Sequence, residues 1–530
     1  MLDPTPMPQD APAPALEGAI PPAAAPSLAK QVAKGAVWMV AIRFASRTLG
    51  LISTLVIARI LLPADFGLVA MATAFSNSVD ALSEVGLRGA LIRHPEDATE
   101  LYDTAFTMQA ARGLITGAVV ASVAPFAARW FGDPRVAPML LVLAALAAAA
   151  GFENIAIAEF QRNFRFGMEF MLRILPRLLQ VATAITAALL LRSYWALLIA
   201  IAVSSLSRLV ATYLVHPHRP RFTLRRWRDL VGFSFWTWAS SLANLVWQRS
   251  DAFIIAPVLG AAAYGLYALA WEVGTLPVTE FVVPVAAALF PGFAEARRRG
   301  DTQTLPPMAV VAFLTLLTLP LAIAISAAAA PVVVVLLGSK WLAAAPLVEI
   351  IALTCLMAPF TGVSNSLLWA DARVVRSFLV AAVSALARVL MLVEAAQSGG
   401  LRTFVWWAAA SLVLQSVVVA VVLRISGELR LRDGAGSMLR TSLAGAATLA
   451  ALWASGSAWH RRPPASTLAA LVQGGATGVL TIAVFAVVVG VLWRLAGSPP
   501  GSEARFVSMV RPLAARLRRE GPATAWRRGL

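Results

Sequence analysis

The chain has 530 residues, of which 59% are hydrophobic and only 13% are charged, and its mean hydropathy is +0.76. Soluble domains carry roughly 25% charged residues, so this composition excludes a soluble globular protein and indicates a chain that lies mostly in a bilayer. The net charge is +17, but the basic residues are scattered over short loops between apolar runs. This scatter argues against nucleic-acid binding, which needs a continuous basic face.

The start of the chain predicts a tail and no cleaved signal peptide. Residues 1–27 are rich in Pro and Ala, carry only acidic charges and lack an apolar core segment. We therefore expect residues 1–29 to form a disordered cytoplasmic tail. The first apolar helix, which follows Lys30 and Lys34, then acts as an uncleaved signal anchor.

Apolar runs of membrane-spanning length follow one another along the rest of the chain. Because about 20 mostly apolar residues cross a bilayer core, the runs predict an all-α integral membrane protein with about fourteen transmembrane helices. The first six are expected near residues 32–60, 66–91, 105–128, 137–157, 171–191 and 194–215. The others are expected near residues 230–256, 264–291, 307–328, 344–370, 374–395, 402–424, 439–457 and 467–493.

This pattern divides the chain into two six-helix lobes, residues 30–215 and 230–424, which are expected to flank a central cleft. A basic cytoplasmic linker, residues 216–229, joins the lobes; it either lies on anionic lipid headgroups or is a plain hydrated connector. Residues 425–494 form an extra helix pair, and residues 495–530 form a basic cytoplasmic tail. The one cysteine, Cys355, permits neither an intramolecular disulfide nor a thiolate metal cluster, so no metal or cofactor is expected.

The distribution of basic residues sets the orientation. Of the 44 Lys and Arg residues, 29 fall in one set of alternate loops and tails, 7 in the opposite loops and 8 within helices. By the positive-inside rule the first set is cytoplasmic, which places both termini in the cytoplasm. The protein is therefore expected to be a multi-pass membrane protein.

An internal repeat relates the two lobes. Residues 57–72 (IARILLPADFGLVAMA) and 255–270 (IAPVLGAAAYGLYALA) share 8 of 16 positions without a gap, and the same offset of 198 pairs Trp38 with Trp236. An even number of helices separates the copies, so they enter the membrane in the same direction. Parallel repeats of this kind are an architecture of alternating-access transporters.

Reactive constellations are sparse, which argues against an enzyme. The four histidines all fall in loops, and no HExxH, GxSxG or Walker pattern occurs. Outer loops of the size that membrane-bound polymerases and glycosyltransferases usually carry are also absent.

The stretches TLVIARILLPADFGLVAMATAFSN (54–77), EVGLRGALIR (84–93) and SDAFIIAPVLGAAAYGLYALAWEVGTLP (250–277) resemble the Wzx-type polysaccharide and lipopolysaccharide biosynthesis flippases. That family belongs to the superfamily of multidrug, oligosaccharidyl-lipid and polysaccharide exporters. The resemblance implies translocation of an undecaprenyl-pyrophosphate-linked oligosaccharide across a bacterial inner membrane, with membrane lipids and other polysaccharide-assembly proteins as partners. A multidrug or small-solute exporter of the same superfamily is the first alternative, and a membrane enzyme of polysaccharide assembly is the second.

Arginines at membrane depth are the candidate site, because a buried Arg costs at least about 2.5–3.5 kcal/mol on insertion scales and usually faces protein or a water-filled cavity. Arg43 and Arg47 share one helix face at a spacing of four. With Arg249 and Arg112 they are the predicted cleft cations, suited to the phosphates of a polyprenyl pyrophosphate. Asp251 either pairs with Arg249 or serves as the ion-coupling site. Four other arginines are interpreted as lying near an interface: Arg59, Arg177, Arg208 and Arg388.

Overall fold

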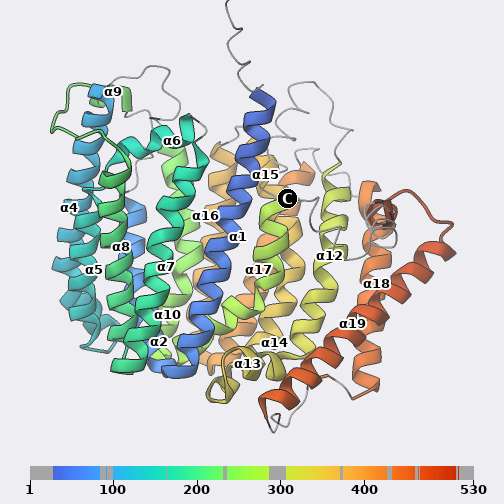
Figure 1. Cartoon of the computed structure of the whole chain (residues 1–530). Helices are drawn as coiled ribbons and strands as arrows, with labels where there is room; N and C mark the ends of the chain where they lie inside the picture. The colour runs from blue at the N-terminus through green and yellow to red at the C-terminus, as the bar shows by residue number, and fades with distance from the viewer. Residues whose placement is uncertain are drawn as a thin grey trace, which may run out of the picture.

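A computed structural model describes residues 28–83, 87, 91, 99–163, 165–230, 235–285, 306–370, 374–425, 432–456, 458–459, 464, 466–508 and 511. Every regular element in these ranges is helical, which confirms the predicted all-α membrane fold (Figure 1). The helices up to the linker are α1 (Leu28–Ile60), α2 (Pro63–Leu82), α4 (Thr99–Trp130), α5 (Val136–Ala150), α6 (Ala158–Arg162), α7 (Phe166–Leu191) and α8 (Trp195–Val215). Residues 1–27, the predicted tail, lie outside the described ranges.

The second part of the chain begins with the short α9 (Trp227–Leu230) and the 40-residue α10 (Phe235–Gly274). A π-helical turn, η2 (Val278–Val282), follows. The remaining helices are α12 (Pro307–Ala327), α13 (Ala329–Leu336), α14 (Ala345–Thr354), α15 (Ala358–Ala370), α16 (Val374–Ser398), α17 (Leu401–Ile425), α18 (Arg432–Ala454) and α19 (Thr467–Leu495). Some bounds differ from the predictions: α2 ends at Leu82 instead of near residue 91, α5 ends at Ala150 instead of near residue 157, and α18 begins at residue 432 instead of 439.

Helix α10 is a hairpin of two antiparallel segments. Gly260 interrupts it with φ 83° and ψ 171°, a conformation that only glycine adopts readily. The Tyr267 hydroxyl donates a 2.5 Å hydrogen bond to Asp251, 16 residues earlier. In a straight helix these residues would lie about 24 Å apart, so the chain reverses at Gly260. Two separately predicted helices thus appear as one element.

Within the described ranges, ten helices are long and apolar enough to cross a membrane, and the bent pair Val136–Ala150 and Ile155–Arg162 makes an eleventh. That count takes α10 as one span. The protein is therefore a multi-pass membrane protein, and the count of fourteen stays a prediction.

The two repeat copies meet at their equivalent glycines. A Cβ at Gly67 would lie 1.7 Å from the carbonyl oxygen of Ala261, and a Cβ at Gly265 would lie 2.0 Å from the carbonyl oxygen of Pro63. Gly67 and Pro63 correspond to Gly265 and Ala261 at the repeat offset of 198. The contact is therefore self-complementary, as expected across a two-fold axis. It brings α2 and the second segment of α10 into backbone contact.

A second pair of contacts repeats in the same way. Trp38 on α1 packs on Phe170 of α7, with ring centroids 5.3 Å apart. Its repeat partner, Trp236 on α10, packs on Phe378 of α16 at 5.5 Å. The packing of α1 on α7 thus corresponds to the packing of the first segment of α10 on α16.

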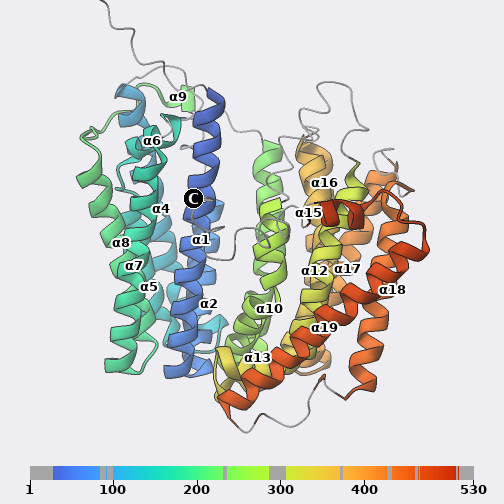
Figure 2. The ribbon, with the colours of Figure 1, turned by 45° about the vertical axis from the view of Figure 1, so that its right-hand side comes forward.

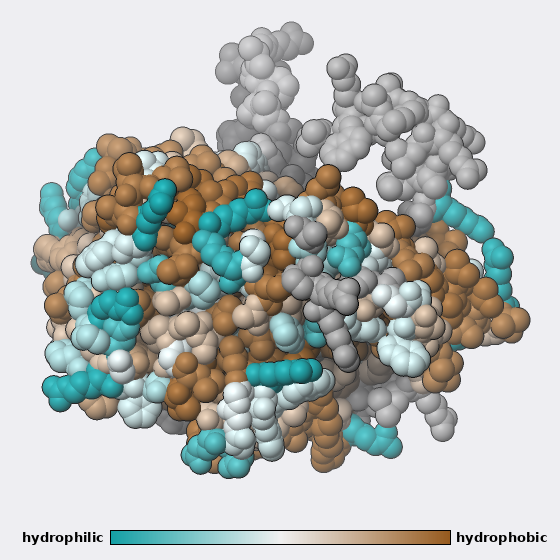
Figure 3. All heavy atoms as spheres, turned by 90° about the horizontal axis from the view of Figure 1, so that it is seen from below, coloured by the Kyte–Doolittle hydropathy of each residue, from teal (hydrophilic) through white to brown (hydrophobic). Residues whose placement is uncertain are grey.

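The end of the molecule where α1 stops is tightly packed. The indole nitrogen of the fully buried Trp341 donates a 2.7 Å hydrogen bond to the carbonyl of Ala58. Arg59, the next residue, donates to the carbonyl of Val335 at the end of α13. The interpretation of Arg59 as lying near an interface stays a prediction. Viewed from this end, hydrophilic side chains are scattered among hydrophobic ones over the face (Figure 3).

Helices α18 and α19 form the extra pair, on the side away from α4 to α8 (Figure 2). They bury Ala444, Leu452 and Phe485 against Leu319 and Ile323 of α12. Large apolar side chains on the other faces of α19 stay exposed, as expected for helices that contact lipid.

The glycine contact can be tested directly. Gly67→Ala and Gly265→Ala should each destabilise the protein by about 1–3 kcal/mol or more, because the new methyl group overlaps a backbone oxygen. Thermal unfolding in detergent should show a lower Tm for both variants. Gly478→Ala on α19 is the control, since a Cβ there meets nothing within 4 Å. Equal Tm values for all three variants would contradict the close contact.

Candidate functional site

A cavity with a volume of about 890 Å³ lies between α1, α7 and α8. Five arginines line it, and we call it the arginine cavity. Its lining consists of Ile42, Arg43, Ser46, Arg47, Leu172, Arg173, Pro176, Arg177, Gln180, Ser204, Arg208 and Pro284.

Helical spacing places these arginines on facing sides of neighbouring helices. Arg43 and Arg47 are four residues apart on α1, and Arg173 and Arg177 are four apart on α7. Residues at this spacing lie one above the other on one helix face. Arg208 adds a fifth guanidinium from α8.

Contacts from α10 and η2 tie α1 to the second half of the chain. The Arg47 guanidinium donates a 2.9 Å hydrogen bond to Glu280 and lies 3.5 Å from a carboxylate oxygen of Glu272. Arg43 donates to the carbonyl of Thr279 at 3.4 Å. Because Pro284 also lines the cavity, the site combines elements from both predicted lobes.

The other cavity arginines are only partly neutralised. Arg173 lies 2.7 Å from Glu169, and Arg208 lies 3.1 Å from Glu153. Arg177 donates a 2.8 Å hydrogen bond to the neutral amide of Gln180.

In the part of the chain that the structure describes, no carboxylate lies within 4.0 Å of Arg43 or Arg177. The arginine cavity therefore carries excess positive charge at membrane depth. Such a site suits a ligand with several anionic oxygens.

The structure brings together two of the four predicted cleft cations. Arg43 and Arg47 line the arginine cavity, whereas Arg112 lies 3.3 Å from Asp80 and joins α4 to α2. Arg249 lines a different cavity.

Sequence reasoning did not place Arg173, Arg177 and Arg208 in the site. Arg173 is one of the 29 basic residues assigned to the cytoplasmic loops and tails, and Arg177 and Arg208 are interpreted as lying near an interface. The four-residue spacing of Arg173 and Arg177 is the same signal that identified Arg43 and Arg47.

A second cavity of about 340 Å³ lies between the two segments of α10 and helices α16 and α17. We call it the aromatic cavity, because four aromatic side chains line it. Its lining consists of Trp247, Gln248, Arg249, Asp251, Ala252, Tyr264, Tyr267, Ala268, Trp271, Arg388 and Leu412.

A buried ion pair forms the floor of the aromatic cavity. One Asp251 oxygen lies 2.6 Å from the Arg388 guanidinium, and the other accepts the Tyr267 hydrogen bond. Arg388 also donates to the Ser411 hydroxyl at 2.6 Å and lies over the Trp247 ring at 4.6 Å from its centroid.

The observed ion pair of Asp251 with Arg388 differs from the sequence-based expectations for both residues. The partner of Asp251 is Arg388 of α16, and not Arg249 as the sequence suggested. Arg388 itself is 2% exposed, so its interpretation near an interface was wrong. The role of Asp251 in ion coupling stays a prediction. Among the described residues, no group of three or more His, Cys, Asp or Glu side chains could hold a metal ion.

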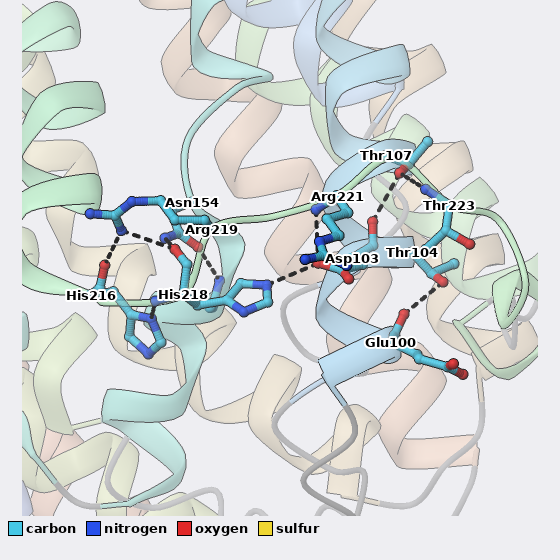
Figure 4. A network of polar contacts seen from close by, with 11 residues as sticks. Glu100, Asp103, Thr104, Thr107, Asn154, His216, His218, Arg219, Arg221 and Thr223 are labelled. Carbon is cyan, nitrogen blue, oxygen red and sulfur yellow. Dashed lines mark hydrogen bonds and ion pairs between the residues drawn. The ribbon is translucent and has the colours of Figure 1, made fainter.

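The basic linker after α8 contacts Asp103 of α4, Asn154, which follows α5 (Figure 4), and Glu159 of α6. His218 contacts Asp103 at 3.0 Å, and the same carboxylate oxygen accepts the backbone N–H of Arg221 at 2.9 Å. His216 contacts Glu159 at 3.1 Å. These contacts fix the linker backbone while leaving the Arg221 side chain exposed.

Removal of the Asp103 carboxylate should loosen this linker. In purified Asp103→Ala, trypsin should cleave after Arg221 at least about fivefold faster, because loss of a buried acceptor costs roughly 1–3 kcal/mol and favours local opening. Glu100→Ala is the matched control, since that side chain is 61% exposed and lies 3.8 Å from Arg225. Equal cleavage of both variants would argue against the linker contacts.

Comparison with curated proteins gives relatives of one kind. The chain is 27% identical to the succinoglycan biosynthesis transport protein ExoT of Rhizobium meliloti over 62% of this chain and 66% of that protein. It is 24% identical to the teichuronic acid biosynthesis protein TuaB of Bacillus subtilis over 72% of this chain and 80% of TuaB. It is 23% identical to the lipopolysaccharide biosynthesis protein WzxC of Escherichia coli over 66% of this chain and 72% of WzxC.

Solved structures share the fold. The lipid II flippase MurJ, in an inward closed conformation, superposes with a TM-score of 0.65 over 86% of this chain and 99% of MurJ, at 14% identity. An inward-facing multidrug transporter of the MATE family superposes with a TM-score of 0.57 over 74% of this chain and 98% of that protein, at 15% identity. The family model described as "Polysaccharide biosynthesis protein" matches residues 56–346, which is more than half of this chain. The chain therefore belongs to the polysaccharide biosynthesis protein family.

Proposed function

We propose that this protein is a flippase that moves an undecaprenyl-pyrophosphate-linked oligosaccharide from the cytoplasmic to the periplasmic leaflet of a bacterial inner membrane. The observation that carries the proposal is the arginine cavity, with its excess positive charge inside the membrane-spanning region. The family, the relatives named for polysaccharide and lipopolysaccharide biosynthesis and the MurJ-like fold support it.

The arginine cavity suits a pyrophosphate because guanidinium groups bind phosphate oxygens through paired, charge-assisted hydrogen bonds. Arg43 and Arg177 offer free charge, and Arg47 exchanges its two carboxylates for phosphate oxygens when the lipid binds. Since Glu272 and Glu280 belong to the second half of the chain, this exchange loosens a tie between the halves.

The tightly packed end of the molecule, where α1 stops, also fits transport by alternating access. Arg47 lies 13 residues before the end of α1, which is about 20 Å along the helix from the contacts around Gly67. Alternating access requires those contacts to separate while the cavity closes toward the other face.

A multidrug exporter is less well supported, because a cavity with excess positive charge repels the cationic drugs that such exporters carry. A membrane enzyme of polysaccharide assembly is less well supported because the relatives include a transport protein and the fold is shared with transporters. Membrane lipids and other polysaccharide-assembly proteins are the proposed partners.

Orientation is part of the proposal and has its own test. A reporter that is active only in the periplasm should work when fused after Lys340 and fail when fused after Arg226, because the linker carries the dense basic cluster. A fusion at the C-terminus should fail in the same way. Activity after Arg226 would reverse the proposed topology.

The arginine cavity should be essential for export. In a strain that lacks the native gene, Arg47→Ala and Arg177→Ala should each lower surface polysaccharide at least about tenfold, because loss of a charged hydrogen bond costs roughly 1.5–3 kcal/mol. Lysine at either position should restore export partly, since it keeps the charge but loses the fork geometry. Two measurements check this prediction. One is an immunoassay of the surface polysaccharide, and the other is the amount of lipid-linked repeat unit in the cytoplasmic leaflet.

Arg129→Ala is the matched control for the arginine variants, because Arg129 is exposed at the end of α4 and outside the cavity. Wild-type export by the Arg47→Ala, Arg177→Ala double variant at normal abundance would exclude the cationic cavity as the cargo site.

A further inference from the structure

We propose that the aromatic cavity binds sugar residues of the cargo while the arginine cavity holds its pyrophosphate. This inference rests on the proposed flippase function and assigns a separate site to the glycan. It follows from the equivalent position of the two cavities, from the chemistry of the lining, and from α10, which lines the aromatic cavity and contacts Arg47 of the arginine cavity through Glu272.

The two cavities occupy corresponding places in the repeat. The arginine cavity lies between α1, α7 and α8, and the aromatic cavity involves the first segment of α10 with α16 and α17. The equivalent pairs Trp38 with Phe170 and Trp236 with Phe378 match α1 and α7 to α10 and α16. Two sites of common origin thus differ in their side chains, which indicates different parts of one ligand.

The aromatic cavity contains polar groups that lack partners. In the described part of the chain, the side chains of Gln248, Arg249 and Tyr264 form no hydrogen bond and no ion pair, although all three line a cavity in a membrane-spanning helix hairpin. Tyr264 is 8% exposed, whereas Gln248 is exposed and Arg249 is half-buried, so these polar groups are open to a polar ligand that enters the cavity.

Aromatic side chains in the same lining favour a sugar over water alone. Trp247, Trp271 and Tyr264 offer apolar faces for the C–H face of a pyranose ring, while the amide of Gln248 and the guanidinium of Arg249 match ring hydroxyls. A few placed polar groups among aromatic walls are typical of small-molecule sites, and the volume of about 340 Å³ lies at the lower end of their range.

The net charge of the aromatic cavity limits which sugars it can bind. Asp251 is neutralised by Arg388 at 2.6 Å, so Arg249 leaves the cavity with one positive charge. The site therefore accepts neutral or acidic sugars and disfavours cationic amines. The network of Asp251, Arg388 and Tyr267 holds the floor rigid, which fixes the cavity before the ligand arrives.

The second segment of α10 links the two cavities. Trp271 lines the aromatic cavity, and the next residue, Glu272, contacts Arg47 of the arginine cavity at 3.5 Å. Consecutive residues of one helix thus take part in both sites, and we place the sugars and the pyrophosphate of one molecule on either side of this segment.

Two lipid probes test the assignment on the full protein in nanodiscs. One is undecaprenyl pyrophosphate without sugar, and the other is the lipid-linked repeat unit extracted from a strain that lacks the gene; native mass spectrometry measures binding. Trp271→Leu and Gln248→Leu should each bind the repeat unit about tenfold more weakly and bind the bare lipid as the wild type does. Arg47→Ala should weaken binding of both lipids.

Trp406→Leu is the matched control, since Trp406 is 54% exposed on α17 and lines neither cavity. If Trp271→Leu fails to fold, the exposed Gln248 still allows the test. Equal binding of the repeat unit by Gln248→Leu and the wild type would overturn the sugar site alone. A wild-type protein that binds neither lipid would overturn the flippase proposal and the sugar site with it.

Discussion

The cost of placing a guanidinium inside a membrane governs this structure. Arginine cannot lose its charge, so each buried arginine needs a carboxylate, a set of polar acceptors or a water-filled cavity. The protein uses all three solutions: Arg388 is enclosed with Asp251, Arg47 is shared between two glutamates, and Arg43 faces an open cavity. The ion pair of Arg388 stiffens the floor of the aromatic cavity, and Arg47 and Arg43 leave positive charge available to a ligand of the arginine cavity.

Close backbone contact at the repeat axis depends on the absence of side chains. Gly67 and Gly265 let α2 and α10 approach until a backbone oxygen fills the place of a Cβ. Side chains of both halves also pack together in this region, because Leu68 and Met71 share one buried apolar cluster with Ile255, so separation of the lobes would expose part of that core. The tie at Arg47 is of a different kind, because an anion can replace its carboxylates. Close packing around Gly67 and Gly265 thus holds one end of the molecule together, whereas ion pairs of Arg47 hold the two halves together at the arginine cavity.

Sequence patterns predicted the helices well because bilayer thickness imposes length and polarity on each of them. They also identified Arg43 and Arg47, whose spacing of four is local information. They could not identify the pair of Asp251 with Arg388, because 137 residues separate these side chains and no periodicity records which helices pack together. The sequence did not show that Arg177 and Arg208 line the arginine cavity for the same reason: the residues on one helix face are readable from sequence, but the neighbour that the face meets is not.

In the proposed transport cycle, Arg47 alternates between two sets of anionic partners, its glutamates and the cargo phosphates. Without cargo, Glu272 and Glu280 neutralise Arg47 and hold α1 against the second half of the chain. A pyrophosphate that displaces them gains paired hydrogen bonds and frees both carboxylates at once. The ligand then binds one arrangement of the halves more strongly than the other, which is the condition for a ligand to shift a conformational equilibrium. Charge exchange at one arginine can therefore couple cargo binding to the separation of the lobes.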